Sequence, residues 1–331
     1  MRKIIWFFLA LCIALTAAAE GRDRGSVEIL NEEIEDEYEE EFGGDDVVLD
    51  PFEELMLDEV TITDAFDKLD SVHNILLLGM DSRGTSVSGR TDTMMLLSVD
   101  VDKKTIKLVS FLRDTYVEIP GNKNNRLNSA YVIGGFDLLA KTLQKNFGVK
   151  PDAYVAINLA GLVDVIDQLG GVDVDVPASK IDRVNAVIYW YNIQVLGSKN
   201  ERQGFLTHGG MQHLNGKQAE AWARYRHSES DFQRSARQRQ LIQILFGKIS
   251  EMSVPQLISF AMDNMYLVKT NLSASDIITL APAVLALKNA EITELQIPLS
   301  SAYTAQTISG MSVLVPDRQT NVNALRKFLE E

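Results

Sequence analysis

Apolar positions along the chain fall into strand-length runs that alternate with helical patterns, starting at Asn74. Residues 74–79 contain the apolar run Ile75 to Leu78, which is typical of a buried strand. Two more strand-length runs, 91–101 and 106–112, flank a polar turn at residues 102–104 and predict a hairpin. Strands that alternate with helices are typical of an α/β domain. We therefore predict an α/β fold, a single α-β-α layered domain with a central mixed sheet.

The later part of the chain continues this alternation. Further strands are predicted over residues 153–158, 172–176 and 291–298, and helices over residues 136–147, 159–169, 215–224, 231–252, 273–287 and 321–330. Gly148 stops the first of these helices, and Ser230 and Asp231 are natural N-caps for the fourth. Between Pro177 and Gly210 the periodicity loosens, and we interpret this segment as a long insertion. The sequence contains no internal repeat that would indicate a second domain.

The first residues have the composition of a secretion signal. Arg2 and Lys3 precede an uncharged run over residues 4–19 that ends in small residues. As a helix this run is about 24 Å long, a little short for a membrane span of about 20 residues. It suits a cleaved signal peptide or a tight signal anchor. We therefore expect the protein on the extracellular face of the cell membrane, held by a single N-terminal anchor, or secreted.

Cysteine usage adds one constraint. Cys12 is the only cysteine and lies inside the apolar run. It follows Leu11, whereas lipid-modified cysteines need a small residue at that position, so we discount a lipoprotein. An oxidising compartment permits disulfides, but the chain after residue 19 has no cysteine to form one. The fold must therefore rest on its core alone.

The net charge of −14 is distributed unevenly. Residues 20–70 hold 21 acidic side chains against three basic ones and have little periodic apolar content. We predict an acidic disordered stalk here, which acts as a spacer, captures cations or repels an anionic wall. Residues 71–331, the predicted folded domain, are nearly neutral. They lack the basic footprint of a nucleic-acid-binding protein.

Several common catalytic signatures are missing from the sequence. There is no Gly-x-Ser-x-Gly elbow, no His-Glu-x-x-His pair, no Walker loop and no dinucleotide-binding glycine fingerprint. The four histidines show no metal-ligand spacing, and no cysteine nucleophile follows the apolar run. Ordinary hydrolase and dehydrogenase interpretations therefore fail.

Arginine and aspartate recur where the predicted buried strands begin or end. These residues are Asp81 and Arg83, Arg90 and Asp92, and Arg113 and Asp114. Ligands of α/β sheets usually lie outside strand ends, so the charged groups are expected to converge on one site. Arg90 and Asp92 are two residues apart, which in an extended strand places both on one face. The alternative is a set of strand-end salt bridges that hold the loops, although three neighbouring pairs favour a ligand.

A second basic cluster begins at Arg224 and Arg226. Residues two apart on a helix point in different directions, so the two can share a site only if the helix ends near Tyr225. Guanidinium forks suit phosphate oxygens.

The following helix carries Arg234, Arg237 and Gln238 at helical spacing. They form one polar edge, and the first turn of this helix offers backbone N–H groups to an anion. The alternative for Arg234 and Arg239 is a solvated basic helix face.

Five segments carry a resemblance to a known family. They are residues 74–83, 89–96, 110–117, 126–130 and 224–242. With these segments in this order, the chain resembles the LytR-CpsA-Psr family over residues 74–245. Its tail near residues 315–317 is compatible with the C-terminal part of that family. Three positions depart from the pattern of the family. Leu112 stands where the family usually has Pro, and Gln233 and Arg239 replace a usual Gly and Gln.

The resemblance implies a transferase that moves a glycopolymer from a polyprenyl-pyrophosphate carrier onto a cell-wall acceptor, usually peptidoglycan, to form a phosphodiester. The implied partners are the lipid-linked glycan, the peptidoglycan acceptor and membrane lipid, with no nucleic acid. The runner-up is a polyprenyl-pyrophosphate hydrolase, and a third hypothesis is a membrane-tethered regulator that binds lipid phosphates. Against a transcription role, only Met1, Arg2 and Lys3 precede the expected membrane segment.

The resemblance also implies roles for individual residues. Asp81 and Asp92 would hold Mg²⁺, with Mn²⁺ as an alternative. The pyrophosphate would be gripped by Arg90, Arg113, Arg224 and Arg226. Arg83, Arg237 and Gln238 would make secondary contacts to phosphate or sugar. Asp231 would position the acceptor hydroxyl or serve only as the N-cap of its helix. No general base is evident, and residues 189–191 are one candidate lining for a prenyl chain, although such stripes are more often core.

Overall fold

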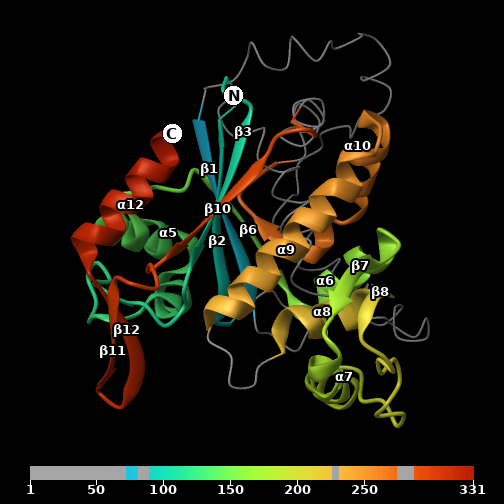
Figure 1. The fold of residues 1–331 in the computed structure, drawn as a ribbon. Coiled ribbons are helices and arrows are strands. Elements are labelled where there is room, and N and C mark those ends of the chain that lie inside the picture. The colour runs from blue at the N-terminus through green and yellow to red at the C-terminus, as the bar shows by residue number, and fades with distance from the viewer. Residues whose placement is uncertain (1–71, 81–88, 101, 226–230, 274–286) are drawn as a thin grey trace, which may run out of the picture.

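The computed structural model of the chain describes residues 72–80, 89–100, 102–225, 231–273 and 287–331 (Figure 1). The predicted signal segment, the acidic stalk and almost all of the helix predicted over residues 273–287 lie outside these ranges. Within them, no helix combines the length and the hydropathy that crossing a membrane requires.

A six-stranded mixed sheet forms the centre of the domain, with strand order β10-β3-β2-β1-β6-β9. Its strands are β1 Val72–Met80, β2 Thr91–Asp100, β3 Thr105–Phe111, β6 Ala153–Asn158, β9 Val268–Thr270 and β10 Ile292–Ile297. Strand β2 is antiparallel to both β1 and β3, whereas β6 is parallel to β1 and β10 is parallel to β3. The predicted hairpin and central mixed sheet are therefore confirmed.

Helices cover both faces of this sheet, which explains why its central strands are apolar throughout. On β1, Ile75 and Leu77 face one core, and Leu76 and Leu78 face the other. The first core is closed by α6 Leu159–Gln168, α7 Ile181–Gln194, α8 Gly216–Arg224, α9 Asp231–Ser250 and α10 Val254–Asp263. The second is closed by α5 Leu127–Phe147 and α12 Arg318–Glu330, on the opposite side in Figure 1.

Two sequence predictions about helices need correction. The segment between Pro177 and Gly210 contains α7, whose buried residues Val184, Ile188 and Tyr191 follow helical spacing. Apolar residues on its outer side, such as Tyr189, obscured that pattern. Helix α5 begins at Leu127, well before the predicted start at Phe136. A kink at Gly134 and Gly135 divides this helix, and only its second half has a clear pattern of apolar residues, so the first half was not predicted.

Several short elements were not predicted at all. The predicted strand over residues 172–176 is confirmed as β7 Val172–Val176, but its partner β8 Gly210–Leu214 was not predicted. The pair β4 Tyr116–Val117 and β5 Asn125–Arg126 was not predicted either. Near the C-terminus, β11 Tyr303–Ile308 and β12 Met311–Pro316 form a hairpin that extends from the body of the domain (Figure 1). This hairpin is tied to the loop after β3, because the backbone N–H of Leu314 donates to the carbonyl oxygen of Asp114 at 2.9 Å.

Candidate functional site

Strand direction brings the charged residues of the first cluster to one edge of the sheet. Strands β1, β3, β6 and β10 run the same way, and β2 runs against them. The loop after β3 therefore lies beside the start of β2. Arg113 stands two residues after β3, and Arg90 and Asp92 stand at the start of β2. This edge is where open α/β sheets usually bind their ligands.

A polar cavity of about 240 Å³ occupies this edge. Its walls are formed by Arg90, Asp92, Arg113, Arg126 and Asn128. The predicted convergence of Arg90, Asp92 and Arg113 is therefore confirmed. Three guanidinium groups and one carboxylate form a lining with excess positive charge, which suits an anion with several oxygen atoms.

The charged side chains at the cavity are connected by ion pairs. Arg113 NH1 lies 2.5 Å from Asp92 Oδ1, and Arg113 Nε lies 3.5 Å from Asp114 Oδ2. Arg126 NH1 lies 3.3 Å from Asp114 Oδ1. The strand-end salt bridges considered from the sequence thus exist. They hold the arginines beside the cavity. The same residues therefore form both the salt bridges and the lining of the candidate ligand site.

Arg126 and Asn128 are the cavity residues that the sequence analysis did not assign. Arg126 is the last residue before α5, and its NH2 donates to the carbonyl oxygen of Ser312 in the β11–β12 hairpin at 2.9 Å. Asn128 is buried. The signal was present, because both belong to the segment 126–130 that carried part of the family resemblance.

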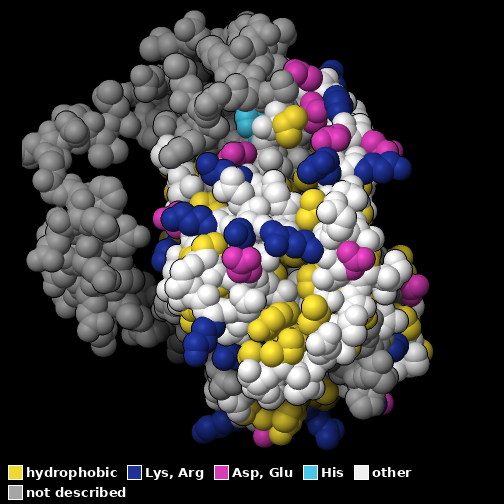
Figure 2. All heavy atoms as spheres, turned by 90° about the vertical axis from the view of Figure 1, so that its left-hand side faces the viewer, with side chains coloured by type: hydrophobic (Ala, Val, Ile, Leu, Met, Phe, Trp, Pro, Cys, Tyr) yellow, Lys and Arg dark blue, Asp and Glu magenta, His cyan; other side chains and the backbone are white. Residues whose placement is uncertain are grey.

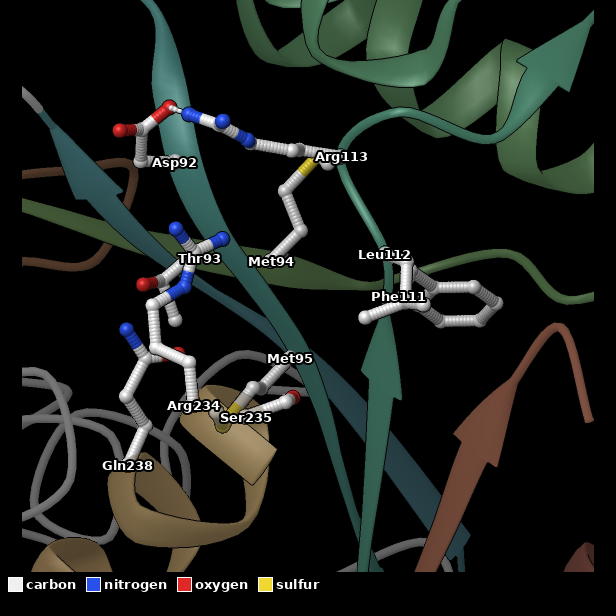
Figure 3. Close-up of a pocket in the computed structure, with 10 residues that line it drawn as sticks. All are labelled: Asp92, Thr93, Met94, Met95, Phe111, Leu112, Arg113, Arg234, Ser235 and Gln238. Atoms are coloured by element: carbon white, nitrogen blue, oxygen red, sulfur yellow. Dashed lines mark hydrogen bonds and ion pairs between the residues drawn. The ribbon is translucent and has the colours of Figure 1, made fainter. Parts of the chain in front are cut away.

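Helix α9 closes a second, much smaller hollow next to the first. Arg234, Ser235 and Gln238 of α9 line it together with Asp92 and Arg113, and Figure 3 shows the side chains of Arg234 and Gln238 directed toward β2. Gln238 thus lies beside the first cluster. Its role as a substrate contact stays a prediction.

The solvated basic face considered for Arg234 and Arg239 is wrong. Their exposed fractions are 8% and 9%. The guanidinium of Arg239 donates to Glu294 of β10 and, at 3.0 Å, to the Oγ atom of Ser110 in β3. Arg239 therefore fastens α9 to the sheet, and Arg234 and Gln238 on the same helix face the start of β2.

Helix α8 ends at Arg224, next to Tyr225, which is the condition under which Arg224 and Arg226 can share a site. Tyr225 is its C-cap and has extended backbone angles, with φ −53° and ψ 142°. Arg237 of α9 donates to the carbonyl oxygens of Trp222 and Tyr225 at 3.1 and 2.7 Å, and its guanidinium carbon lies 3.8 Å from the centre of the Tyr225 ring. Arg237 thus fixes this helix end. A substrate contact for it stays a prediction.

Arg224 lies in the last turn of α8, beside that cap. Its NH1 donates to Glu220 Oε1 at 2.8 Å, and its guanidinium carbon lies 5.4 Å from the centre of the Trp190 ring. It does not line either hollow described above. Its predicted partner Arg226 lies outside the described residues, as do Asp81, Arg83 and the side chain of Asp231, so their placement stays a prediction.

Of the two predicted metal ligands, Asp81 and Asp92, only Asp92 lies within the residues that the structure describes. One of its carboxylate oxygens pairs with Arg113, and the other points away from that arginine (Figure 3). In the part of the chain that the structure describes, no three His, Cys, Asp or Glu side chains form a metal cage. A single carboxylate beside a phosphate-sized cavity fits Mg²⁺, which is usually held by one or two carboxylates together with substrate phosphates.

Basic side chains also gather on the face of the molecule that α5 and α12 cover (Figure 2). The exposed ones on these helices include Lys141, Lys145, Arg326 and Lys327. Arg318 lies beside them, in a hollow of about 400 Å³, but its Nε donates to the carbonyl oxygen of Asn146 and caps the end of α5. This hollow therefore lacks the clustered arginines and aspartates of the sheet-edge cavity.

The fold and the arginine-lined edge define an α/β protein that handles anionic ligands. Residues 50–329 match the model of the LytR_cpsA_psr family, and the chain belongs to this family. The resemblance inferred from the motifs is thereby confirmed. The match begins at residue 50, within the segment predicted as a stalk.

The relatives include a regulatory protein and a teichoic acid transferase. Regulatory protein MsrR of Staphylococcus aureus is 32% identical over 267 residues, 80% of this chain and 76% of its own. TagU of Bacillus cereus, named a polyisoprenyl-teichoic acid–peptidoglycan teichoic acid transferase, is 32% identical over 265 residues, 78% of this chain and 79% of its own. Among solved structures, TagT of B. subtilis bound to LIIa-WTA has a TM-score of 0.63 and 26% identity, covering 83% of this chain and 93% of TagT.

Proposed function

We propose that the protein transfers a glycopolymer from a polyprenyl-pyrophosphate carrier onto peptidoglycan. The observation that carries this proposal is the cavity at the sheet edge, where Arg90, Arg113 and Arg126 surround Asp92. The relative TagU is named for this reaction, and the related TagT structure is described as bound to LIIa-WTA. A lipid-linked wall polymer is therefore the substrate class that fits best.

The reaction is a phosphoryl transfer. A hydroxyl oxygen of the acceptor sugar attacks the phosphorus atom that carries the glycan, and the bond from that phosphorus to the bridging oxygen of the pyrophosphate breaks. The prenyl phosphate leaves with the electron pair of that bond, and the hydroxyl proton passes to the surrounding solvent or to the leaving phosphate. Negative charge increases on the bridging oxygen as the bond breaks, and preorganised guanidinium groups stabilise such charge.

The ion pairs give the arginines a defined position before substrate arrives. Arg113 is held by Asp92 and Asp114, and Arg126 by Asp114. Because long side chains lose rotamer entropy when they are ordered, this arrangement reduces the cost of binding. Arg234 and Gln238 add donors from α9 on the neighbouring side.

Mg²⁺ is part of the proposal, with Mn²⁺ as the alternative. Asp92 would hold the ion, and Asp81 would join it from the loop after β1. When bound, the ion neutralises charge on the phosphate oxygens. We place the reaction on the extracellular side of the membrane, with residues 1–19 as the signal or anchor, because lipid-linked polymers meet peptidoglycan there.

The test is transfer in vitro. The full chain in detergent micelles is incubated with Mg²⁺, a synthetic prenyl-pyrophosphoryl oligosaccharide and peptidoglycan fragments, beside an Arg113→Ala variant. We expect glycan on peptidoglycan with the native sequence, and a loss of about 10²-fold or more in the variant. Cleavage of the lipid without glycan attachment would identify a hydrolase instead. Tight binding with neither reaction would support the regulatory role that the name of MsrR suggests.

A further inference from the structure

Helix α8 contains a completely buried carboxylate that the proposed reaction does not use. The side chain of Glu220 has an exposed fraction of 0%. An ionised carboxylate in such a place is costly unless a charged partner compensates it. Its Oε1 atom accepts a hydrogen bond from Arg224 NH1 at 2.8 Å. The two residues are four apart, which places them on one face of the helix.

Arg224 is held from a second direction by an aromatic ring. The Trp190 ring belongs to α7, and its centre lies 5.4 Å from the guanidinium carbon of Arg224, within cation–π range. The side chain of Arg224 keeps an exposed fraction of 26%, so it connects the buried Glu220 to the surface. A guanidinium is a rigid planar fork. A carboxylate at one nitrogen and a ring within cation–π range therefore set the direction of the whole group.

We propose that Glu220, together with Trp190, is a positioning residue that fixes the guanidinium of Arg224 for binding a phosphate group of the lipid carrier. This inference rests on the proposed function, because the family resemblance assigns Arg224 to the pyrophosphate. Glu220 does not touch substrate in this arrangement. Its effect on the reaction passes entirely through Arg224.

The charge of Glu220 matters as well as its shape. A carboxylate accepts a charge-assisted hydrogen bond, which is about twice as strong as one to a neutral amide. Glu220→Gln keeps the size of the side chain and an acceptor oxygen but weakens this bond. The guanidinium of Arg224 then samples more orientations, and fewer of them are productive. Transition-state stabilisation falls because it depends on preorganisation.

The experiment is a double-mutant cycle on the full chain in detergent micelles. Glu220→Gln and Trp190→Leu are each made in the native sequence and in an Arg224→Ala background. Two quantities are measured: kcat and KM for glycan transfer, and the Kd of farnesyl pyrophosphate with Mg²⁺ by calorimetry. Asp164→Asn is the control, because it too turns a carboxylate into an amide, at a partly buried position on the neighbouring helix α6. Thermal unfolding checks that each variant folds.

We expect Glu220→Gln to lower kcat/KM on the order of tenfold, mostly through kcat, and to weaken farnesyl pyrophosphate binding at least about threefold. Trp190→Leu should act in the same direction. In the Arg224→Ala background both substitutions should have no further effect, which a merely structural role would not produce. Equal effects in the two backgrounds, or no effect in either, would overturn the proposal.

Failure of this inference can be told apart from failure of the proposed function. If the native protein binds farnesyl pyrophosphate but transfers no glycan, the proposed reaction is wrong while the binding cycle still tests Glu220. If transfer occurs and the cycle shows independent effects, the reaction stands and the positioning role of Glu220 is wrong. If the native protein neither binds nor transfers, both are wrong.

Discussion

Arg113 and Asp92 meet across two antiparallel strands, with Arg113 NH1 2.5 Å from Asp92 Oδ1. One residue follows β3 and the other starts β2, so their contact depends on the sheet register rather than on sequence proximity. Both side chains are partly exposed. Such a pair adds little to stability, roughly 0–1 kcal/mol. Its value lies in holding a guanidinium and a carboxylate ready at one cavity.

Replacing Asp92 by Asn should therefore separate activity from stability. We expect Asp92→Asn to lower glycan transfer about 10²-fold. The unfolding free energy should change by no more than about 1 kcal/mol. The Mg²⁺ concentration for half-maximal activity should rise, because one ligand oxygen loses its charge. A metal titration of both proteins measures this, and an unchanged midpoint would remove Asp92 from the metal site.

Arg126 is expected to be as important as the arginines assigned from the sequence. It lines the cavity and is anchored to Ser312 and Asp114. Arg126→Ala should reduce transfer about 10²-fold, and Arg126→Lys should restore part of it, since a lysine keeps the charge but not the fork. Lys123→Ala, an exposed position three residues earlier, is the control. Equal activity of Arg126→Ala and the control would contradict the assignment.

The ion pair between Arg239 and Glu294 should contribute to stability and not to chemistry. Glu294→Leu leaves the largely buried guanidinium of Arg239 without its carboxylate and should cost about 3 kcal/mol of unfolding free energy. Arg239→Met leaves the carboxylate of the more exposed Glu294 and should cost less, about 1 kcal/mol. The double substitution should recover most of that loss, because the uncompensated charge disappears. Urea unfolding midpoints of the four proteins measure this. Additive losses in the double variant would show that the two residues act separately.

Asp164 gives the stability of the protein a defined pH dependence. Burial, and then the nearby charge of Asp167, raise the pKa of the Asp164 carboxyl from 3.8 to about 6. The folded state therefore binds this proton more tightly than the unfolded state does. Stability from this group is present below pH 3.8 and is lost as the pH rises through about 6.

Asp164→Asn removes that loss. At pH 8 the variant should be more stable than the native sequence by about 1 kcal/mol, after allowance for solvent screening of this partly buried side chain. The advantage should shrink as the pH falls from 8 to 4. Thermal unfolding across this range measures it, with Asp175→Asn, an exposed position on β7, as the control. An advantage that does not change with pH would rule out ionisation as its cause.

Gly216 lets α8 approach α6 at the start of α8. A Cβ atom at this position would lie 2.1 Å from the carbonyl oxygen of Val163. Gly216→Ala should therefore push the two helices apart and cost about 3 kcal/mol, the upper end for overpacking. Gly247 in α9 faces open space, and Gly247→Ala should stabilise the protein by about 1 kcal/mol through helix propensity. Urea unfolding of the two variants measures this, with a lower midpoint expected for Gly216→Ala and a higher midpoint for Gly247→Ala.

The central sheet was predictable because its strands are apolar on both faces and are separated by clear turns. The meeting of Arg90, Asp92 and Arg113 followed from their places at strand ends. Arg126 and Arg239 were not predictable from local pattern, because their partners Ser312 and Glu294 lie 186 and 55 residues further along the chain. Contacts over such separations depend on how the layers pack, and periodicity carries no information about that.

Helix α7 escaped prediction for a different reason. Its inner residues follow the helical period, but Tyr189 and other apolar side chains on the outer side weaken the contrast between its faces. The kink in α5 had a similar effect, because Gly134 and Gly135 read as a boundary although the helix continues on both sides. In both cases tertiary packing stabilises a helix whose own sequence signal is weak.

The β11–β12 hairpin also determines when the site can first work. During synthesis Arg126 emerges long before Ser312, and the loop after β3 emerges before Leu314. The hairpin contacts that brace Arg126 and Asp114 form only after nearly all of the chain has been made. A chain still being synthesised therefore holds most of its arginines but not their final arrangement, and the cavity is complete only when the last strand pair has folded.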